Sequence, residues 1–135
     1  MEATANTYDV AVIGGGPTGC VAALAFARKG KRVLVCEANP RSKERLAGEW
    51  LHPPALEIME ELGISVAPEQ GYLSGRGFAV FPDDGSKPVV LPYQAPRMGL
   101  AIEHHRLVDL LRAAVRRNPF IEYFDETKAT RILGQ

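Results

Sequence analysis

The sequence has few cysteines and histidines and no excess of either charge, which argues against a zinc protein and against a nucleic-acid-binding protein. Two cysteines and three histidines occur among 135 residues, and the cysteines lack the C-x-x-C spacing typical of zinc sites. Sixteen basic residues balance sixteen acidic ones, which removes long-range attraction to nucleic acid. No apolar run approaches the ~20 residues of a membrane helix, and the first seven residues do not resemble a signal peptide. We therefore expect a cytoplasmic protein with no membrane span, no metal site and no nucleic-acid partner.

The length and composition indicate an ordinary globular domain. With 46% hydrophobic and 24% charged residues, the chain is long enough to bury a single core. Cys20 and Cys36 both lie in apolar stretches, so we expect them to be buried thiols.

The first third of the chain has the pattern of a parallel βαβ unit. Residues 8–13 form an apolar run rich in β-branched types and are followed by glycines, which indicates a buried strand. Residues 17–29 have helical spacing, with proline at the first position and Gly30 as a stop. Residues 32–36 form a second apolar strand. Strand, helix and strand in this order predict a right-handed parallel crossover.

The remaining chain alternates helices, turns and short strands. The polar stretch 39–49 is expected to be a loop. Helices are predicted at 53–62 and 104–117, where apolar residues recur at helical spacing. Strands are predicted at residues 77–81, 88–93, 120–124 and, beginning near the end of the chain, 129–133. The first two of these strands are joined by a turn containing Asp84-Gly85, which is typical of a hairpin.

The strongest motif is a glycine-rich turn between the first strand and the first helix. It satisfies G-x-G-x-x-G and consists of Gly14, Gly15, Gly16, Pro17, Thr18 and Gly19. In such a motif the first glycine permits a tight turn, the second admits a pyrophosphate against the backbone, and the third allows close helix–strand packing. The free N–H groups at the helix start then face the phosphates, assisted by the helix dipole.

A carboxylate at the end of the second strand completes the nucleotide-binding pattern. Glu37 follows the glycines by about 20 residues, the position from which an acidic residue accepts hydrogen bonds from a ribose. Ala38 beside it is included in the predicted site. Glu37 also argues against a 2′-phosphorylated nucleotide here, because two anions repel. Both FAD and NAD carry an ADP half, so the motif alone leaves the choice open.

The segment 45–63 resembles a motif of squalene-monooxygenase-like enzymes. That motif runs R-x-x-G-E-x-L-x-P and continues to L-x-x-L-G, and here it reads Arg45-Leu46-Ala47-Gly48-Glu49-Trp50-Leu51-His52-Pro53 and onward to Gly63. Flavin-dependent halogenases and geranylgeranyl reductases carry looser versions. A second stretch, His104-His105-Arg106-Leu107, is similar to one that opens a helix in the same superfamily, which includes p-hydroxybenzoate hydroxylase. The resemblance extends from residue 8 to about residue 133.

The resemblance implies a cofactor and roles for individual residues. It implies FAD, with NAD(P)H as a transient reductant, in a monooxygenase that hydroxylates or epoxidises an aromatic or polyene small molecule. Arg45 and Arg106 match arginines that contact FAD, and a guanidinium suits phosphate because it can donate two hydrogen bonds. Gly48 and Glu49 match positions near the flavin ring or in the loop below it. No catalytic side chain is assigned, since the flavin performs the redox chemistry in this superfamily.

The histidines are not expected to form a functional cluster. His104 and His105 are consecutive, so their side chains diverge and cannot share a metal. We expect surface or capping roles for both, and a loop position for His52.

The resemblance also implies that the α/β fold is incomplete. It predicts a Rossmann-like FAD-binding βαβ core from residues 8–70 and 98–135, with residues 71–97 as the first hairpin of a substrate-domain sheet. Later cofactor-binding motifs of the superfamily are not found in residues 1–135. Three interpretations stay open: a fragment of a full monooxygenase, one part of a split enzyme completed by a second chain, or a truncated homologue. A flavin-dependent reductase or halogenase, or a non-catalytic nucleotide-binding module, are the alternative functions.

Overall fold

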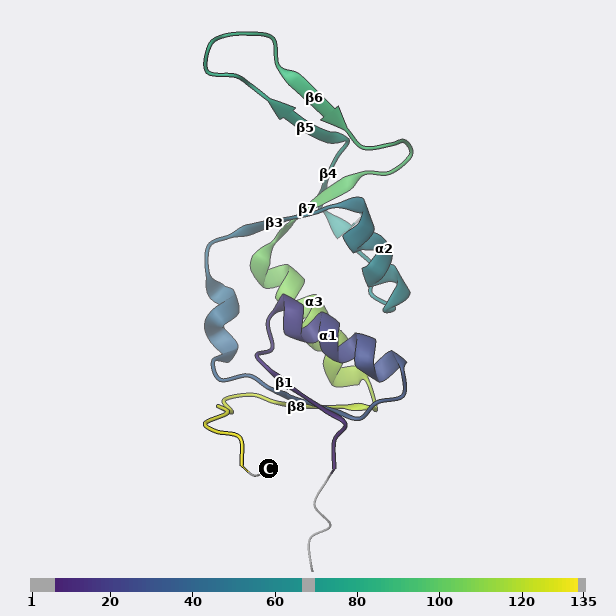
Figure 1. Cartoon of the computed structure of the whole chain (residues 1–135), viewed down its shortest axis with the longest axis vertical. Helices are drawn as coiled ribbons and strands as arrows, with labels where there is room; N and C mark the ends of the chain where they lie inside the picture. Colours follow the sequence, from purple (N-terminus) through teal and green to yellow (C-terminus); the bar gives the residue numbers. More distant parts are fainter. Residues whose placement is uncertain (1–6, 67–69, 134–135) are drawn as a thin grey trace, which may run out of the picture.

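The structure is a computed structural model that describes residues 7–66 and 70–133 (Figure 1). It contains eight strands, three α-helices and one 3-10 helix within those residues. In chain order these elements are β1 (Val10–Ile13), α1 (Pro17–Arg28), β2 (Val33–Cys36), η1 (Pro40–Glu44), β3 (Gly48–Leu51), α2 (Pro53–Glu61), β4 (Leu73–Gly75), β5 (Gly77–Val80), β6 (Val89–Pro92), β7 (Gly99–Glu103), α3 (His104–Arg117) and β8 (Ile121–Phe124).

A parallel sheet of three strands carries the glycine-rich motif. Its order is β1-β2-β8, with Val10 opposite Val33 and Val33 opposite Ile121. Helix α1 is the crossover between β1 and β2, so the predicted βαβ unit is confirmed. The mixed α/β fold predicted from the sequence is confirmed with it.

A second, antiparallel sheet lies beyond the N-terminal end of α3. Its order is β3-β7-β4, and β7 runs directly into α3. The hairpin of β5 and β6 continues past this sheet and forms the end of the molecule opposite the parallel sheet (Figure 1). Six of its large apolar side chains are at least 44% exposed: Phe78, Val80, Phe81, Val89, Val90 and Leu91.

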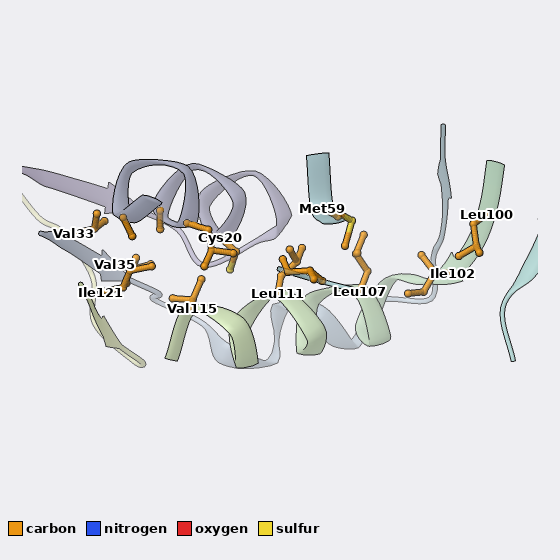
Figure 2. Close-up of a cluster of buried hydrophobic side chains, with 14 residues drawn as sticks. Cys20, Val33, Val35, Met59, Leu100, Ile102, Leu107, Leu111, Val115 and Ile121 are labelled. Atoms are coloured by element: carbon orange, nitrogen blue, oxygen red, sulfur yellow. The ribbon is translucent and has the colours of Figure 1, made fainter. Parts of the chain in front are cut away.

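The core is a continuous row of apolar side chains between the two sheets. Figure 2 shows Val33, Val35 and Ile121 at the parallel sheet, then Cys20 and Val115, and then Leu111 and Leu107 toward Ile102 and Leu100 of β7. Helices α1 and α3 supply half of the 14 buried residues of this cluster, four from α1 and three from α3. Because one helix, α3, packs against both sheets, it fixes the distance between them. Cys20 and Cys36 are both buried free thiols, as predicted.

Two sequence-based predictions about the fold were wrong, and two strands were missed. The polar stretch 39–49 is not a loop throughout, because it contains η1 and the start of β3. Strands β4 and β7 were not predicted. Residues 129–133 form no strand. The division into a core of residues 8–70 and 98–135 and an insertion of 71–97 stays a prediction, although β4, within that insertion, pairs with β7.

None of the helices within residues 7–66 and 70–133 has the length and apolar character needed to cross a membrane.

Candidate functional site

The glycine-rich turn has the backbone geometry that its sequence requires. Gly14 follows β1 with a φ of 105°, a conformation that side chains with a Cβ rarely adopt. Gly16 precedes α1 in an extended conformation and offers no side-chain cap to the helix. A Cβ at Gly19 would collide with the carbonyl oxygen of Gly14. The turn can therefore close only with glycine at these crowded or strained positions.

Open space lies against the turn where a diphosphate would sit. A Cβ added to Gly14 or to Gly16 would meet no atom within 4 Å. Pro17 is half-buried and Thr18 is exposed at the same helix N-terminus. Unpaired N–H groups and the positive end of the helix dipole attract phosphate oxygens. The residues present therefore fit a bound dinucleotide.

Glu37 lies beside the turn, at the end of β2. Its Oε2 accepts a hydrogen bond from the backbone N–H of Gly15 at 2.8 Å, and its Oε1 accepts one from the N–H of Asn39 at 2.7 Å. The residue is only 7% exposed, whereas its neighbour Ala38 is exposed. A direct hydrogen bond thus links the carboxylate expected to hold a ribose to the turn expected to hold phosphates.

Arg112 completes this cluster, and the sequence-based reasoning missed it. It projects from α3, is 3% exposed and forms an ion pair with Glu37 at 3.2 Å. Its other nitrogens donate to the carbonyl oxygens of Gly15 at 2.8 Å and Pro40 at 2.7 Å. A signal was present in the sequence, since Arg112 lies on the same helix face as the buried residues Val108 and Val115.

A second cluster joins the loop after η1 to the start of α3. His104 is 4% exposed, and its Nδ1 lies 2.6 Å from Oε1 of Glu49. Arg45 lies 3.6 Å from the same carboxylate oxygen. The backbone N–H of His104 donates to the carbonyl oxygen of Ala47 at 2.9 Å. The structure therefore brings together Arg45 and Glu49, two predicted site residues.

The prediction of a surface or capping role for His104 was wrong. Strand β7 ends against β3, which places the first residue of α3 over Glu49 and away from solvent. His105 is exposed, as expected. Its side chain leaves the helix in a different direction from that of its neighbour.

Replacing His104 with alanine is expected to lower the free energy of unfolding by about 1–3 kcal/mol, because the half-buried Glu49 carboxylate loses its shortest hydrogen bond and retains the longer contact with Arg45. Urea denaturation followed by circular dichroism measures the change. The matched control is His105→Ala, one residue along the helix, which should stay within about 0.5 kcal/mol of the wild type. Equal losses in the two variants would contradict the buried role of His104.

Arg106 and Gly48 lie on a separate cleft of about 430 Å³. The guanidinium of Arg106 stacks 4.4 Å from the ring centroid of Tyr72 and donates to the carbonyl oxygen of Gln70 at 3.0 Å. Glu49 and Trp50 line the same cleft. Three of the predicted site residues, Gly48, Glu49 and Arg106, thus share one cavity. The glycine-rich turn and Glu37 are not among the residues that line it.

Trp50 makes both a hydrogen bond and an aromatic ring contact at the base of the β5–β6 hairpin. Its indole N–H donates to the hydroxyl of Tyr93 at 2.8 Å, and that hydroxyl lies 2.8 Å from Nδ1 of His52. Phe78 packs edge-on against Trp50, with ring centroids 5.8 Å apart. His52 is exposed and precedes α2, in keeping with the loop position predicted for it.

Across the described ranges, 7–66 and 70–133, His, Cys, Asp and Glu side chains form no cluster of three or more that could hold a metal ion.

Comparison with known proteins matches residues 7–132 to the FAD binding domain family. Squalene epoxidase of Aspergillus fumigatus is 33% identical over 137 residues, an alignment that covers 95% of this chain and 27% of that protein. The chain therefore spans about a quarter of the length of this curated relative.

Solved structures of flavoproteins share the fold. PqsL, a probable FAD-dependent monooxygenase from Pseudomonas aeruginosa, superimposes with a TM-score of 0.78 at 20% identity, covering 96% of this chain and 36% of that one. The myxobacterial chondrochloren halogenase CndH, an FAD-dependent halogenase, gives a TM-score of 0.75 at 25% identity, covering 88% and 28%.

The family match takes in the glycine-rich turn, Glu37 and the whole of α3. The geometry of the turn and the match over residues 7–132 agree, and the chain belongs to the FAD binding domain family.

Proposed function

We propose that this chain forms the ADP-binding part of the FAD site of a monooxygenase. The enzyme would use NAD(P)H and O₂ to hydroxylate or epoxidise a polyene or aromatic small molecule. The observation that carries the proposal is the hydrogen bond between Glu37 and Gly15, placed beside open space at Gly14 and Gly16. The similarity to squalene epoxidase over 95% of the chain supports a monooxygenase in particular.

Two regions of the described structure would each bind a different part of the cofactor. The turn from Gly14 to Gly19 would hold the pyrophosphate, and Glu37, with Ala38 beside it, would hold the ribose of the adenosine half. Arg45 would approach the phosphates or the sugar chain from the loop after η1. Its side chain is 63% exposed, so it can turn from its ion pair with Glu49 toward an anion.

The cleft lined by Gly48, Glu49 and Arg106 would face the flavin end of the cofactor. Arg45 lies on the chain between Glu37 and this cleft and pairs with Glu49, which lines the cleft, so it connects the two regions. When bound, FAD supplies the redox chemistry with O₂, and the protein supplies position and charge. Within this cleft, Arg106 would orient the cofactor, because Tyr72 and the carbonyl oxygen of Gln70 hold its guanidinium.

A flavin-dependent halogenase is the second candidate. The observation that favours it is the similarity to the chondrochloren halogenase, with 25% identity over 88% of this chain. The monooxygenase is preferred because the 33% identity to squalene epoxidase extends over nearly the whole chain.

Replacing Arg45 with alanine is expected to weaken FAD binding by about 1–3 kcal/mol, because a charge-assisted hydrogen bond to the cofactor is lost. A fluorescence titration of the purified chain with FAD measures the affinity. The matched control is Arg41→Ala in η1, an exposed arginine of the same loop region, which should leave the affinity unchanged. Unchanged FAD affinity in both variants would remove Arg45 from the proposed site.

A further inference from the structure

We propose that Arg112 is a positioning residue that orients Glu37 for recognition of the ribose hydroxyls. This inference rests on the proposed binding of the ADP half of FAD. Arg112 itself is buried beneath the turn and is expected to make no contact with the cofactor.

The guanidinium of Arg112 has all three of its nitrogens engaged in the cluster. Nε donates to the carbonyl oxygen of Gly15, Nη1 to that of Pro40, and Nη2 to Oε2 of Glu37. A planar group with a fixed fork of donors holds all three acceptors in one geometry. Lysine, with a single ammonium group, cannot reproduce this arrangement.

The contacts form a closed ring that includes the glycine-rich turn. Gly15 donates its N–H to Glu37 and accepts from Arg112 through its carbonyl, and Arg112 pairs with Glu37. The backbone N–H and the carbonyl oxygen of Gly15 are therefore both committed to the cluster. The orientation of the turn and that of the carboxylate are set together.

Within the ring, the two carboxylate oxygens of Glu37 accept different numbers of hydrogen bonds. Oε2 accepts from both Gly15 and Arg112, whereas Oε1 accepts only from the N–H of Asn39 among the hydrogen bonds of the described residues. A carboxylate oxygen has about two acceptor sites. Oε1 is therefore the oxygen with capacity for a ribose hydroxyl, and Arg112 directs it by holding Oε2.

The contacts of Arg112 distinguish it from Arg116, the next arginine on α3. Arg116, one helical turn further along α3, is 47% exposed in its side chain and pairs with Asp125 instead. Tyr123 packs below Gly15, and burial raises the pKa of its hydroxyl to about 12, so it brings no negative charge near the ring at neutral pH. Glu37 is the acidic partner of Arg112 in the described structure.

The test compares ADP with 2′,3′-dideoxy-ADP, which lacks both ribose hydroxyls, by isothermal titration calorimetry on the full chain. The wild type should bind ADP at least about tenfold more tightly than the dideoxy compound. Arg112→Met should bring this ratio close to one, and Arg112→Lys should give an intermediate ratio. Arg116→Met is the matched control and should keep the wild-type ratio. Circular dichroism melts establish that each variant is folded.

The outcomes separate the inference from the proposed function. Failure of the wild type to bind ADP would overturn the proposed function and this inference with it. Wild-type binding without discrimination, or a wild-type ratio in either folded Arg112 variant, would overturn the inference alone. Unfolding of both Arg112 variants would make the residue part of the scaffold and would also overturn it. A reduced ratio in a folded Arg112 variant, with Arg116→Met unaffected, would support it.

Discussion

Replacing Glu37 with alanine is expected to lower the free energy of unfolding by about 3–5 kcal/mol, a large share of the stability of a small domain. The substitution leaves the Arg112 guanidinium, only 3% exposed, without its acidic partner. It also removes the acceptor for the N–H of Gly15. An uncompensated buried charge costs far more than the net contribution of the pair that neutralised it. Guanidinium chloride denaturation measures the loss.

A double variant separates the cost of the isolated charge from that of lost packing. Glu37→Met combined with Arg112→Met removes both charges, so it should be less destabilised than Glu37→Ala alone. The exposed pair of Asp125 and Arg116 is the control, and Asp125→Ala should cost less than about 1 kcal/mol. A double variant as unstable as the single one would contradict the ion-pair account of this cluster.

Replacing Gly16 with alanine is expected to weaken FAD binding by about tenfold or more, or roughly 1.4 kcal/mol, without lowering stability. Gly16 has a φ of −80°, which alanine adopts readily, and the added Cβ would point into open space. In the proposed site that space belongs to the pyrophosphate. FAD titration and thermal melting of the same preparation measure the two effects.

Gly19→Ala is the contrasting variant of the same turn. Its Cβ would collide with the carbonyl oxygen of Gly14, so the helix must move away from the strand. We expect both lower stability, by about 1–3 kcal/mol, and weaker binding. Unaltered FAD affinity in a folded Gly16→Ala protein would place the pyrophosphate elsewhere.

The sequence predicted those elements whose signals are local. Helix α3 begins and ends at the predicted residues 104 and 117, and β1, α1 and β2 lie within one or two residues of their predicted bounds. The signals that predicted these elements are the apolar runs, the proline at the start of α1 and the glycine after it. All of them lie within those segments or next to them. The G-x-G-x-x-G motif likewise lies within one turn, so it can be recognised from consecutive residues. Short-range patterns of this kind need no knowledge of the rest of the fold.

The missed features depend on partners distant in sequence. Strand β3 is short and polar at its start, and it is a strand because it pairs with β7, more than 45 residues away. The burial of His104 and of Arg112 depends on Glu49 and Glu37 in the same way. Both residues lie on the apolar face of α3, so the helical pattern marked their positions without identifying their partners.

A fluorescence titration of the purified 135-residue chain with FAD, and with NAD in parallel, tests whether the glycine-rich turn and Glu37 bind the ADP half of FAD. We expect saturable binding that is selective for FAD, since Arg45 and the cleft at Glu49 lie where the flavin half would extend. Binding selective for NAD, or no binding of either by a folded chain, would contradict it.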